Sequence, residues 1–460
     1  MNKLSFLFSL WLVKVLSKLI SLFQIGQGSN FPGKIGLKLN KYLIENFKFS
    51  KAAKLILVTG TNGKSTTCGL LASILKTTGK KVIYNKSGAN LLSGIATTFS
   101  YYANIVGYIN CDYIVLEVDE ATLPLLTLKL RPDVIAVTNL FRDQLDRFGE
   151  LDTTAKLIEK GINNNKNITI VLNADDARVA FLNTDNRKTY FGINTQNSLD
   201  KNRDWFSDPK EITKCPICKT ELIFISHSIA HLGNFICNGC NLQRPDISFL
   251  AANIKRDSLT TNFDIFGFGF EKTNNNFFIS QIGLFNLYNA LCSVAIAKTV
   301  FDITPMQIQK GFQSYSTIFG RGERIKVKDK TAWIYLIKNP TGTTETLKTL
   351  CDFNNARFLI AINDNYADGR DISWLWDTRF DLLASHKNKI YVSGKRAYDM
   401  SLRLKYANID NDLITISENL STAISQSLKS LKENETLYIL PTYTALLEMQ
   451  QKGWCKNAPL

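Results

Sequence analysis

The sequence contains no run of more than two consecutive basic residues, although its formal net charge is +15. It also lacks the interleaving of aromatic and basic residues that surfaces for single-stranded nucleic acids use. A nucleotidase that depends on nucleic acid is therefore disfavoured, and we expect no nucleic acid as a partner. The positive balance still favours another anionic partner, such as a membrane surface or a phosphorylated substrate. An ordinary solvated basic surface is the alternative.

No apolar stretch of the length of a membrane span is free of charge. The nearest candidate, Leu4 to Phe23, is interrupted by Lys14 and Lys18. A spanning helix would hold both lysines near its centre, at a cost of about 2.5–3.5 kcal/mol each. No small-residue cleavage site follows, which disfavours a secretory signal. Two interpretations remain: a helix packed on the body of the protein, or an amphipathic helix on a membrane surface with both lysines on its wet face.

Cysteines are scattered except for one group. Five of the nine occur singly, mostly in apolar patterns, which is typical of reduced core thiols in a cytosolic protein rather than of disulfides. The other four form two Cys-x-x-Cys pairs with eighteen residues between them: Cys215, Cys218, Cys237 and Cys240. This spacing predicts a zinc ribbon with a closed, structural Zn²⁺ site. We expect His227 and His231 nearby to be hairpin residues rather than ligands of an open catalytic zinc.

The segment from Leu55 to Thr67 combines a strand, a glycine turn and a helix. A branched apolar run breaks at Gly60, and an apolar-periodic helix follows Lys64. Such a turn presents backbone amides to an anion, its lysine can reach the β- and γ-phosphates of ATP, and its serine can reach Mg²⁺. The glycines stand two residues closer together than in the common P-loop, and an ordinary glycine turn is the alternative. The candidate nucleotide-binding residues are Gly60, Thr61, Asn62, Gly63, Lys64, Ser65 and Thr66.

Short apolar runs alternate with helical segments between residues 54 and 173, which predicts a doubly wound α/β domain. Ligands of such sheets gather at the carboxyl ends of the strands, where several of these runs carry polar residues. Glu117 is the Mg²⁺ candidate, across from Ser65, and a strand-end carboxylate in solvent is the alternative. Asn139 belongs to the same edge and is a further candidate nucleotide-binding residue. The expected strands are Lys54–Thr59, Lys81–Tyr84, Tyr113–Glu117, Val134–Thr138 and Ile168–Leu172.

Two features follow the ribbon. Asn286 and Asn289, at helical spacing, either cap an apolar helix or hold a nucleotide base. Arg321, between two glycines, suits a hinge that delivers a cation to phosphate. From about Val327, apolar runs and helical segments resume as a second α/β domain, with strands expected at Ala332–Ile337, Arg357–Ile362, Lys389–Val392 and Glu435–Leu440. The predicted division is an N-terminal helical segment at 1–50, an ATP-binding domain at 51–325 with the ribbon inserted at about 206–245, and an α/β domain at 326–460.

In this order the motifs resemble the Mur ligases, the ATP-dependent amide-forming enzymes of peptidoglycan synthesis, and most closely the MurT family among them. The resemblance covers nearly the whole chain. It implies a Mur-ligase-like central domain and a Rossmann-like C-terminal domain. The general pattern is carried by Gly60–Lys64, Glu117, Asn139–Asp146, Asn286 with Asn289, Gly320-Arg321 and Asn339-Pro340. The narrower one is carried by the ribbon and by Phe31–Ile35, Leu116–Thr122, Thr138–Arg147 and Leu440–Ala445.

The resemblance implies a reaction shared by two subunits. A GatD-like glutaminase releases ammonia from glutamine, and a chain of this kind uses ATP to activate the α-carboxylate of D-glutamate in lipid II as an acyl phosphate. Ammonia then gives D-isoglutamine. Magnesium and Lys64 would neutralise charge as the phosphoryl group moves. The implied location is cytoplasmic, at the inner face of the cell membrane, in a heterodimer or a larger complex.

Two departures separate the sequence from the amino-acid-adding Mur ligases. Those enzymes usually carry a histidine where this chain has Gln144, and another where it has Lys338. Both departures weaken the alternative that the chain adds an amino acid, as muramyl-peptide or folylpolyglutamate ligases do. They also leave a second metal site open, because glutamine is a poorer ligand than imidazole for most divalent ions, although acceptable for magnesium.

A carboxylate-rich segment from Asn363 to Asp377 is not explained by ATP chemistry. A capped turn followed by core tryptophans would account for it. In the MurT family, an aspartate of the C-terminal domain is thought to complete the Cys-His pair of the glutaminase. The candidates here are Asp368 and Asp371, ranked above Asp364, and the sequence does not decide among them.

Overall fold

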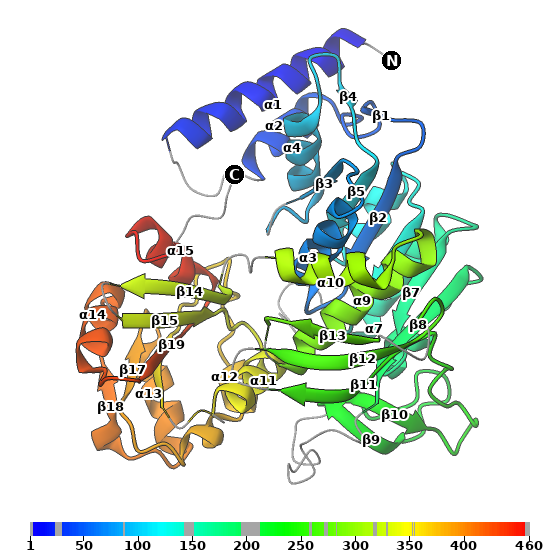
Figure 1. The fold of residues 1–460 in the computed structure, drawn as a ribbon. Helices are drawn as coiled ribbons and strands as arrows, with labels where there is room; N and C mark the ends of the chain where they lie inside the picture. The colour runs from blue at the N-terminus through cyan, green and yellow to red at the C-terminus, as the bar shows by residue number, and fades with distance from the viewer. Residues whose placement is uncertain are drawn as a thin grey trace.

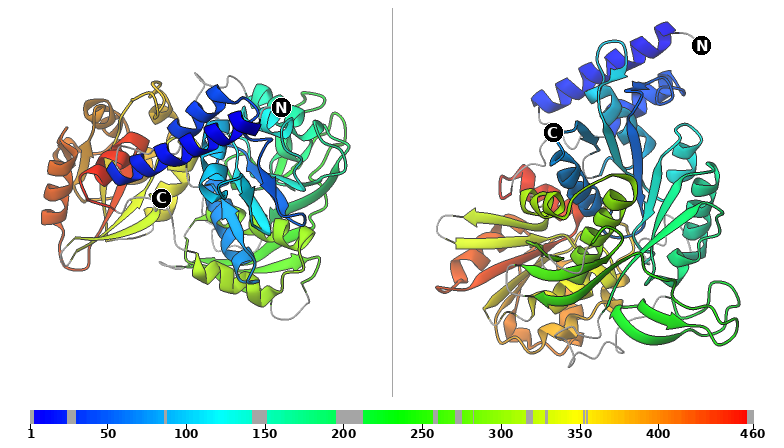
Figure 2. Two further views of the ribbon diagram at one scale, coloured as in Figure 1. Left: turned by 90° about the horizontal axis from the view of Figure 1, so that it is seen from above. Right: turned by 45° about the vertical axis from the view of Figure 1, so that its right-hand side comes forward.

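The computed structural model describes residues 3–23, 30–85, 88–141, 151–194, 212–256, 260–270, 275–281, 283–315, 320–327, 330–351, 353 and 355–455. Figure 1 shows two α/β units side by side beneath a layer of N-terminal helices. Viewed from above, the long first helix crosses the top of the molecule (Figure 2). Both α/β sheets predicted from the sequence are present.

The larger sheet has nine strands in the order β13-β12-β11-β8-β7-β6-β2-β5-β3. All neighbours from β11 to β3 pair in parallel, whereas β12 and β13 are antiparallel additions at one edge. The strands are β2 (Lys54–Thr59), β3 (Val82–Tyr84), β5 (Tyr113–Glu117), β6 (Val134–Val137), β7 (Thr169–Asn173), β8 (Arg187–Ile193), β11 (Phe249–Arg256), β12 (Thr261–Gly267) and β13 (Asn276–Ile279).

Alternation along the central strand supplies two separate cores. In β2, Ile56 and Val58 face one core, and Leu55 and Leu57 face the other. The first core is covered by α3 (Lys64–Lys76), α9 (Leu284–Val300) and α10 (Pro305–Ser314). The second is covered by α1 (Lys3–Phe23), α4 (Leu92–Tyr102), α5 (Leu123–Thr127) and α7 (Leu151–Asn163). A sheet buried on both faces explains why its strands read as unbroken apolar runs.

The N-terminal layer consists of α1, α2 (Phe31–Leu39) and α4, with a short parallel pair, β1 (Lys48–Phe49) and β4 (Tyr108–Ile109), beside it. Phe6, Leu10 and Val13 of α1 are buried in the core beneath it. The first helix thus packs on the body of the protein along one of its faces. Among the helices that the structure describes, none is long and apolar enough to cross a membrane.

The ribbon is inserted between β8 and β11, which are parallel neighbours. Its hairpin pairs β9 (Ile223–Ile229) with β10 (Leu232–Ile236), and its small apolar core lies beside α8 (Ala177–Ala180). His227 lies on β9, and His231 lies in the turn between the two strands. Both histidines are therefore hairpin residues, as predicted.

The second sheet has six strands in the order β14-β15-β19-β16-β17-β18, all parallel except for the β14–β15 hairpin. One face carries α11 (Pro340–Leu350), α12 (Trp374–Asp377), η2 (Phe380–Leu383) and α13 (Ala397–Tyr406), and the other carries α14 (Leu420–Ser430) and α15 (Tyr443–Gln451). The turn η3 (Asn411–Leu413) precedes β18. The strands are β14 (Arg321–Val327), β15 (Lys330–Tyr335), β16 (Ala356–Ala361), β17 (Ile390–Ser393), β18 (Ile414–Ile416) and β19 (Thr436–Pro441).

One boundary differs from the sequence analysis. The second unit was expected from residue 326, but β14 begins at Arg321 and pairs with β15 from its first residue. The second sheet therefore begins earlier in the chain than the apolar pattern suggests. The pattern misses β14 because this strand has few apolar residues among its charged ones.

Candidate active site

The turn between β2 and α3 lies at the carboxyl edge of the central sheet, where β2 has β5 on one side and β6 on the other. Gly60 and Gly63 have φ values of +115° and +87°. Both are crowded, since a Cβ on Gly60 would lie 2.5 Å from Oγ1 of Thr138 and one on Gly63 would lie 1.9 Å from Oδ1 of Asn289. Only glycine fits such positions. The turn therefore has the shape that the sequence predicts for a phosphate cradle.

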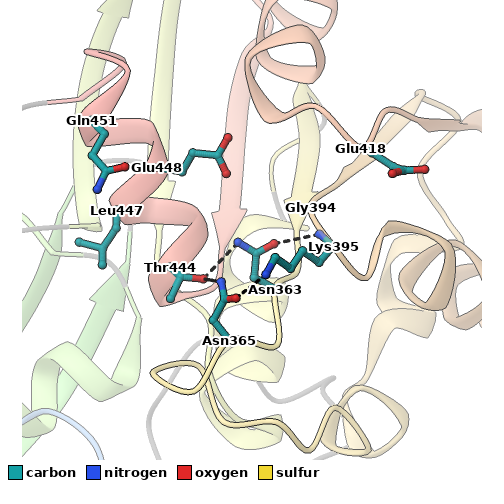
Figure 3. Close-up of a pocket in the computed structure, with 9 residues that line it drawn as sticks. All are labelled: Asn363, Asn365, Gly394, Lys395, Glu418, Thr444, Leu447, Glu448 and Gln451. Carbon is teal, nitrogen blue, oxygen red and sulfur yellow. Dashed lines mark hydrogen bonds between the residues drawn. The ribbon is translucent and has the colours of Figure 1, made fainter.

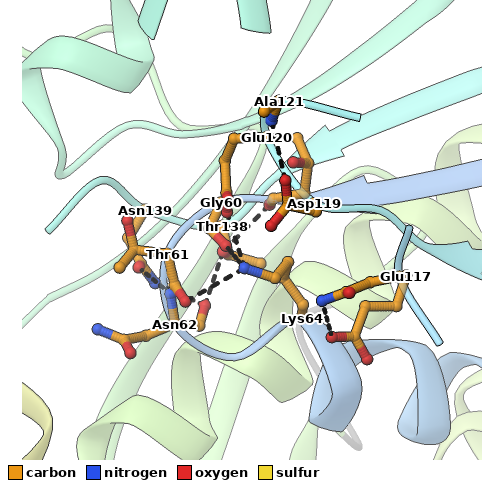
Figure 4. A network of polar contacts seen from close by, with 12 residues as sticks. Gly60, Thr61, Asn62, Lys64, Glu117, Asp119, Glu120, Ala121, Thr138 and Asn139 are labelled. Carbon is orange, nitrogen blue, oxygen red and sulfur yellow. Dashed lines mark hydrogen bonds and ion pairs between the residues drawn. The ribbon is translucent and has the colours of Figure 1, made fainter. Parts of the chain in front are cut away.

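Asn139 braces this turn from the neighbouring strand end (Figure 4). Its Oδ1 accepts a hydrogen bond from the backbone N–H of Asn62 at 2.9 Å, and its Nδ2 donates to the carbonyl of Asn62 at 3.1 Å. Thr138 Oγ1 donates to the same carbonyl at 2.7 Å. Asn139 is buried and does not line the cavity described below. Its contacts are those of a residue that positions the turn.

The side chain of Lys64 lies beneath the turn, between backbone carbonyls and a carboxylate. Its Nζ donates to the carbonyl of Gly60 and to Oε1 of Glu120, the latter at 2.7 Å, and both side chains are buried. Burial alone would lower the pKa of Lys64, but the charges of Glu120 and Glu117 outweigh it and raise the pKa above its ordinary value. The amine is therefore held in its charged form.

Ser65 and Glu117 meet as the sequence predicts. Ser65 Oγ donates to Oε2 of Glu117 at 2.5 Å, and Asn90 Nδ2 donates to the other carboxylate oxygen at 3.3 Å. Asn85 fixes the strand end, because its Oδ1 accepts from the backbone N–H of Glu117. A buried carboxylate beside a hydroxyl is a set of oxygen ligands that Mg²⁺ accepts. These two residues are therefore not a solvent-exposed strand end.

The second sheet closes this site from the opposite side. Asn339 Nδ2 donates to Oδ1 of Asn62 at 3.0 Å, and Lys338 Nζ lies 3.4 Å from the carbonyl of Thr61. Between the two units lies a cavity of about 460 Å³. Its lining includes the turn from Thr61 to Thr66, the carboxylates Glu117, Asp119 and Glu120, and residues of the second unit such as Tyr335, Thr346 and Tyr443.

Asn286 and Asn289 also line the cavity. The N-cap of α9 is Gly283, without a side-chain cap, so neither asparagine caps this helix. Asn289 Oδ1 is buried and has no hydrogen-bond partner among the residues that the structure describes. Arg321 begins β14, next to Gly320 in the lining, and the structure does not describe its side chain. Gln144 lies outside the described residues.

The three candidate aspartates have different surroundings. Asp364 accepts two hydrogen bonds from the guanidinium of Arg396, at 2.9 and 2.6 Å. Asp368 is buried and accepts from the backbone and hydroxyl of Thr444 at the start of α15, at 2.7 and 2.5 Å. Burial raises the pKa of Asp368, although these hydrogen bonds oppose the shift. Asp371 is exposed and accepts from the backbone and the hydroxyl of Ser373.

Asp368 also lies between two cavities. It lines the larger one, while its partners Thr444 and Asn365 line a second cavity of about 350 Å³ at the carboxyl ends of β16 and β17. Figure 3 shows this second cavity, with Thr444 bonded to Asn363 and Asn365, and Lys395 bonded to Asn365. Asp368 is thus a fixed part of the wall.

The four grouped cysteines converge as predicted. Their Sγ atoms all lie within 4.8 Å of one another, with Cys215–Cys240 at 3.6 Å and Cys218–Cys237 at 3.4 Å. Ligands of tetrahedral zinc at about 2.3 Å would stand about 3.8 Å apart, so the donors fit such an ion. Neither His227 nor His231 belongs to this cluster.

Comparisons with known proteins agree with this architecture. The family model of the Mur ligase middle domain matches residues 58–242, and that of the MurT ligase C-terminal domain matches residues 336–446. The MurT subunit of the glutamine-hydrolysing lipid II isoglutaminyl synthase of Streptococcus pneumoniae is 34% identical, over 94% of this chain and 93% of its own. The chain belongs to the MurT family.

Other relatives extend the comparison. The MurT subunit from Staphylococcus aureus strain COL is 29% identical over 93% of each chain. A pseudomurein peptide ligase type C from Methanothermus fervidus superposes with a TM-score of 0.66 at 21% identity, covering 88% of this chain and 80% of that one. A MurF structure from Acinetobacter baumannii gives 0.64 at 15% identity, covering 91% and 79%. The fold is thus that of the Mur ligases, and membership of the family makes the chain an ATP-dependent ligase.

Sequence reasoning missed several residues of the site. Glu120, Asn90 and Asn85 were not singled out, although Glu120 lies in the stretch that carries the resemblance. Lys338 and Asn339 were noted only as motif positions, and their contacts with the turn depend on how the two units pack. The sequence offered one signal for these residues: Glu120 is charged and follows the end of β5 by three residues.

Proposed function

We propose that this chain catalyses the ATP-dependent amidation of the α-carboxylate of D-glutamate in the stem peptide of lipid II, giving D-isoglutamine for peptidoglycan synthesis. The observation that carries the proposal is the cavity between the two sheets. There the Lys64–Glu120 pair and the Ser65–Glu117 pair face Lys338 and Asn339 of the second unit. The name of the Streptococcus pneumoniae relative, a subunit of lipid II isoglutaminyl synthase, supports the choice of substrate.

ATP and Mg²⁺ fit this site on two observations. The Gly63 turn has no room for a Cβ, and the lining residue Asn289 has a buried side-chain oxygen without a hydrogen-bond partner among the described residues. When bound, ATP supplies the phosphoryl group that activates the carboxylate as an acyl phosphate, and Mg²⁺ neutralises the moving charge. We assign the amides of residues 60–66 and Lys64 to the phosphates, and Ser65 with Glu117 to the metal. Asn286 and Asn289 are assigned to the base, and Arg321 to the closing hinge.

The charge of Lys64 is balanced by Glu120 in the structure. Phosphate oxygens offer the amine a second anionic partner, so we expect Lys64 to share its hydrogen bonds between them and Glu120. Lys338 stands where related ligases carry a histidine, and its amine reaches the turn at Thr61. It therefore adds positive charge to the wall that faces the phosphates.

Ammonia is proposed to come from a GatD-like glutaminase subunit. The described residues that line the cavity include neither cysteine nor histidine, the pair used for glutamine hydrolysis in such subunits. Of the three aspartates, Asp371 has the surroundings that suit a partner's histidine. It is exposed, and the exposed rings of Tyr366 and Trp376 lie close to it in the sequence. Asp368 is buried and bonded to Thr444, and Asp364 is bonded to Arg396, whereas Asp371 is bonded to the exposed Ser373, two residues further along the chain.

The proposal is tested with the chain, its GatD-like partner, lipid II and ATP, supplied with either glutamine or ammonium. The expected product is the amide, seen by mass spectrometry with both nitrogen sources. Lys64→Ala should abolish it, whereas Lys76→Ala at the other end of the same helix should not. Incorporation of an amino acid without any partner would instead establish the alternative of an amino-acid ligase.

A paired variant tests the aspartate. Asp371→Asn should remove glutamine-driven product but keep ammonium-driven product, because the ammonium-driven reaction does not need the glutaminase. Asp377→Asn, exposed a short way along the chain, is the control and should keep both. An Asp371→Asn variant that retains full glutamine-driven activity would refute this assignment.

A further inference from the structure

The outer side of α1 carries an apolar stripe that no other part of the described structure covers. Six of its residues expose between 44% and 75% of their surface: Leu4, Phe8, Trp11, Val15, Leu19 and Leu22. They recur at intervals of three and four, which places them along one side of the helix. The opposite side, with Phe6, Leu10 and Val13, is already buried. The stripe is therefore additional to the core.

The stripe continues onto a second segment. The loop before β4 exposes Ile105 by 66% and Val106 by 56%, and Trp11 Nε1 donates to the carbonyl of Ile105 at 3.0 Å. Tyr101 and Tyr102, at the end of α4, are exposed as well. Figure 1 shows this loop beside α1 at the top of the molecule. We call α1, the end of α4 and this loop the N-terminal face.

Charge on the N-terminal face has one sign. The first 44 residues contain six lysines and neither aspartate nor glutamate, and residues 88–111 contain no charged residue. Lys3 and Lys18 on α1 are exposed, and Lys34 and Lys38 are exposed on the neighbouring helix α2, which packs against α1. Apolar and aromatic side chains among lysines are the composition of helices that lie in the interface of an anionic bilayer. A protein partner of mixed charge would not need this bias.

The lining of the active-site cavity reaches the helices that support this face. Asn30 at the start of α2, and Gly88 and Leu91 before α4, belong to its lining. The two helices that run from this rim are those that support α1. Phe31, the first residue of α2, is exposed by 56%. A molecule that reached the cavity from a membrane beneath α1 would therefore pass along residues of the same layer.

We propose that the N-terminal face lies on an anionic lipid bilayer, with α1 parallel to the membrane plane and its stripe in the headgroup region. This membrane contact would hold the cavity close to a lipid-linked substrate. The proposal rests on the proposed function only for the choice of that substrate. Lys14 is bonded to the protein itself, since its Nζ donates to the carbonyl of Ala103. The expectation that Lys14 and Lys18 both lie on a face open to water is therefore wrong for Lys14.

The test is co-sedimentation of the full-length chain with vesicles of phosphatidylglycerol and phosphatidylcholine, or of phosphatidylcholine alone. The wild type should bind the anionic vesicles more tightly than the neutral ones, and added salt should weaken the binding. Phe8→Glu with Leu19→Glu should lower the partition coefficient by about tenfold or more. The control, Phe268→Glu, alters a side chain that is 75% exposed in the turn after β12, and it should bind as the wild type does.

Thermal unfolding and ATP hydrolysis of the double variant should match those of the wild type, because both side chains point away from the core. Equal sedimentation of the double variant and the wild type would overturn the proposal. The proposal would also be overturned if neither protein bound vesicles and the wild type formed a dimer that the double substitution dissociates. A second copy of the chain would then cover the stripe. Vesicle binding needs neither ATP nor lipid II, so its loss is distinguishable from a failure of the amidation reaction.

Discussion

Replacing Gly63 by alanine would put a methyl group where the structure has no room for one. The new Cβ would stand 1.9 Å from Oδ1 of Asn289, in a backbone with φ of +87°. The left-handed conformation costs alanine about 1–2 kcal/mol. Overpacking against a buried side chain adds about 1–3 kcal/mol. We therefore expect the free energy of unfolding to fall by about 2–5 kcal/mol in total.

Gly79→Ala is a matched control. Gly79 has a φ of +75°, but a Cβ there would meet nothing within 4 Å. This variant should lose only the backbone cost of about 1–2 kcal/mol. The difference between the two variants then measures the crowding at the turn alone.

Urea unfolding and ATP affinity are the two measurements. Gly63→Ala should be less stable than Gly79→Ala and should bind ATP at least about tenfold more weakly, a difference of about 1.4 kcal/mol. Adding Asn289→Ala should recover part of the lost stability, because it removes the atom that the methyl group would strike. If both glycine variants lose the same stability and bind ATP alike, the account of a crowded phosphate cradle is wrong.

Three further changes can be checked in the same way. Asn339→Ala should lower the free energy of unfolding by about 1 kcal/mol, because the N-cap of α11 is lost, and it should also weaken ATP binding. Asn419→Ala, which removes the N-cap of α14, should lower the stability by a similar amount and leave ATP binding unchanged. Unfolding curves and ATP titrations measure the two effects. Cys218→Ser should remove about one zinc per chain, measured by elemental analysis, and leave ATP binding largely intact, while Cys351→Ser outside the cluster should keep the metal. Because burial raises the pKa of Asp368, the folded chain keeps that proton after the unfolded chain has lost it, so stability should fall as the pH rises from about 3.9 to the raised value and then level off. Asp368→Asn should remove this slope from pH-dependent unfolding curves.

Much of the fold could be predicted because the strands of both sheets are buried on two faces. The predicted limits of β2 and β5 are those of the structure, and β16 and β19 differ by one residue at each end. Among the strands that the expected list omitted are β8, which begins with three polar residues, and β14, which is rich in charged residues and lies at the edge of its sheet. Such strands are specified by their neighbours more than by their own pattern.

The candidate site, like the fold, could be predicted from the sequence only in part. The turn from Gly60 to Ser65 is local, so its sequence predicts its shape. The Lys64–Glu120 pair and the contact of Asn339 with Asn62 join segments far apart in the chain, and no local pattern predicts them. Asn139 was assigned to the nucleotide, yet its hydrogen bonds hold the turn. The ranking of the three aspartates that we propose rests on their contacts with Thr444 and Arg396, which the sequence does not show.

The central claim is that the substrate carboxylate attacks ATP and is then converted to an amide. Its most direct test uses lipid II whose glutamate α-carboxylate carries a heavy isotope at both oxygens, incubated with the chain, its partner, ATP and glutamine. The account predicts that inorganic phosphate gains one labelled oxygen for each amide formed, because the activated carboxylate leaves that oxygen with the phosphoryl group. Amide formed while the phosphate stays unlabelled, or amide formed without ATP, would contradict it.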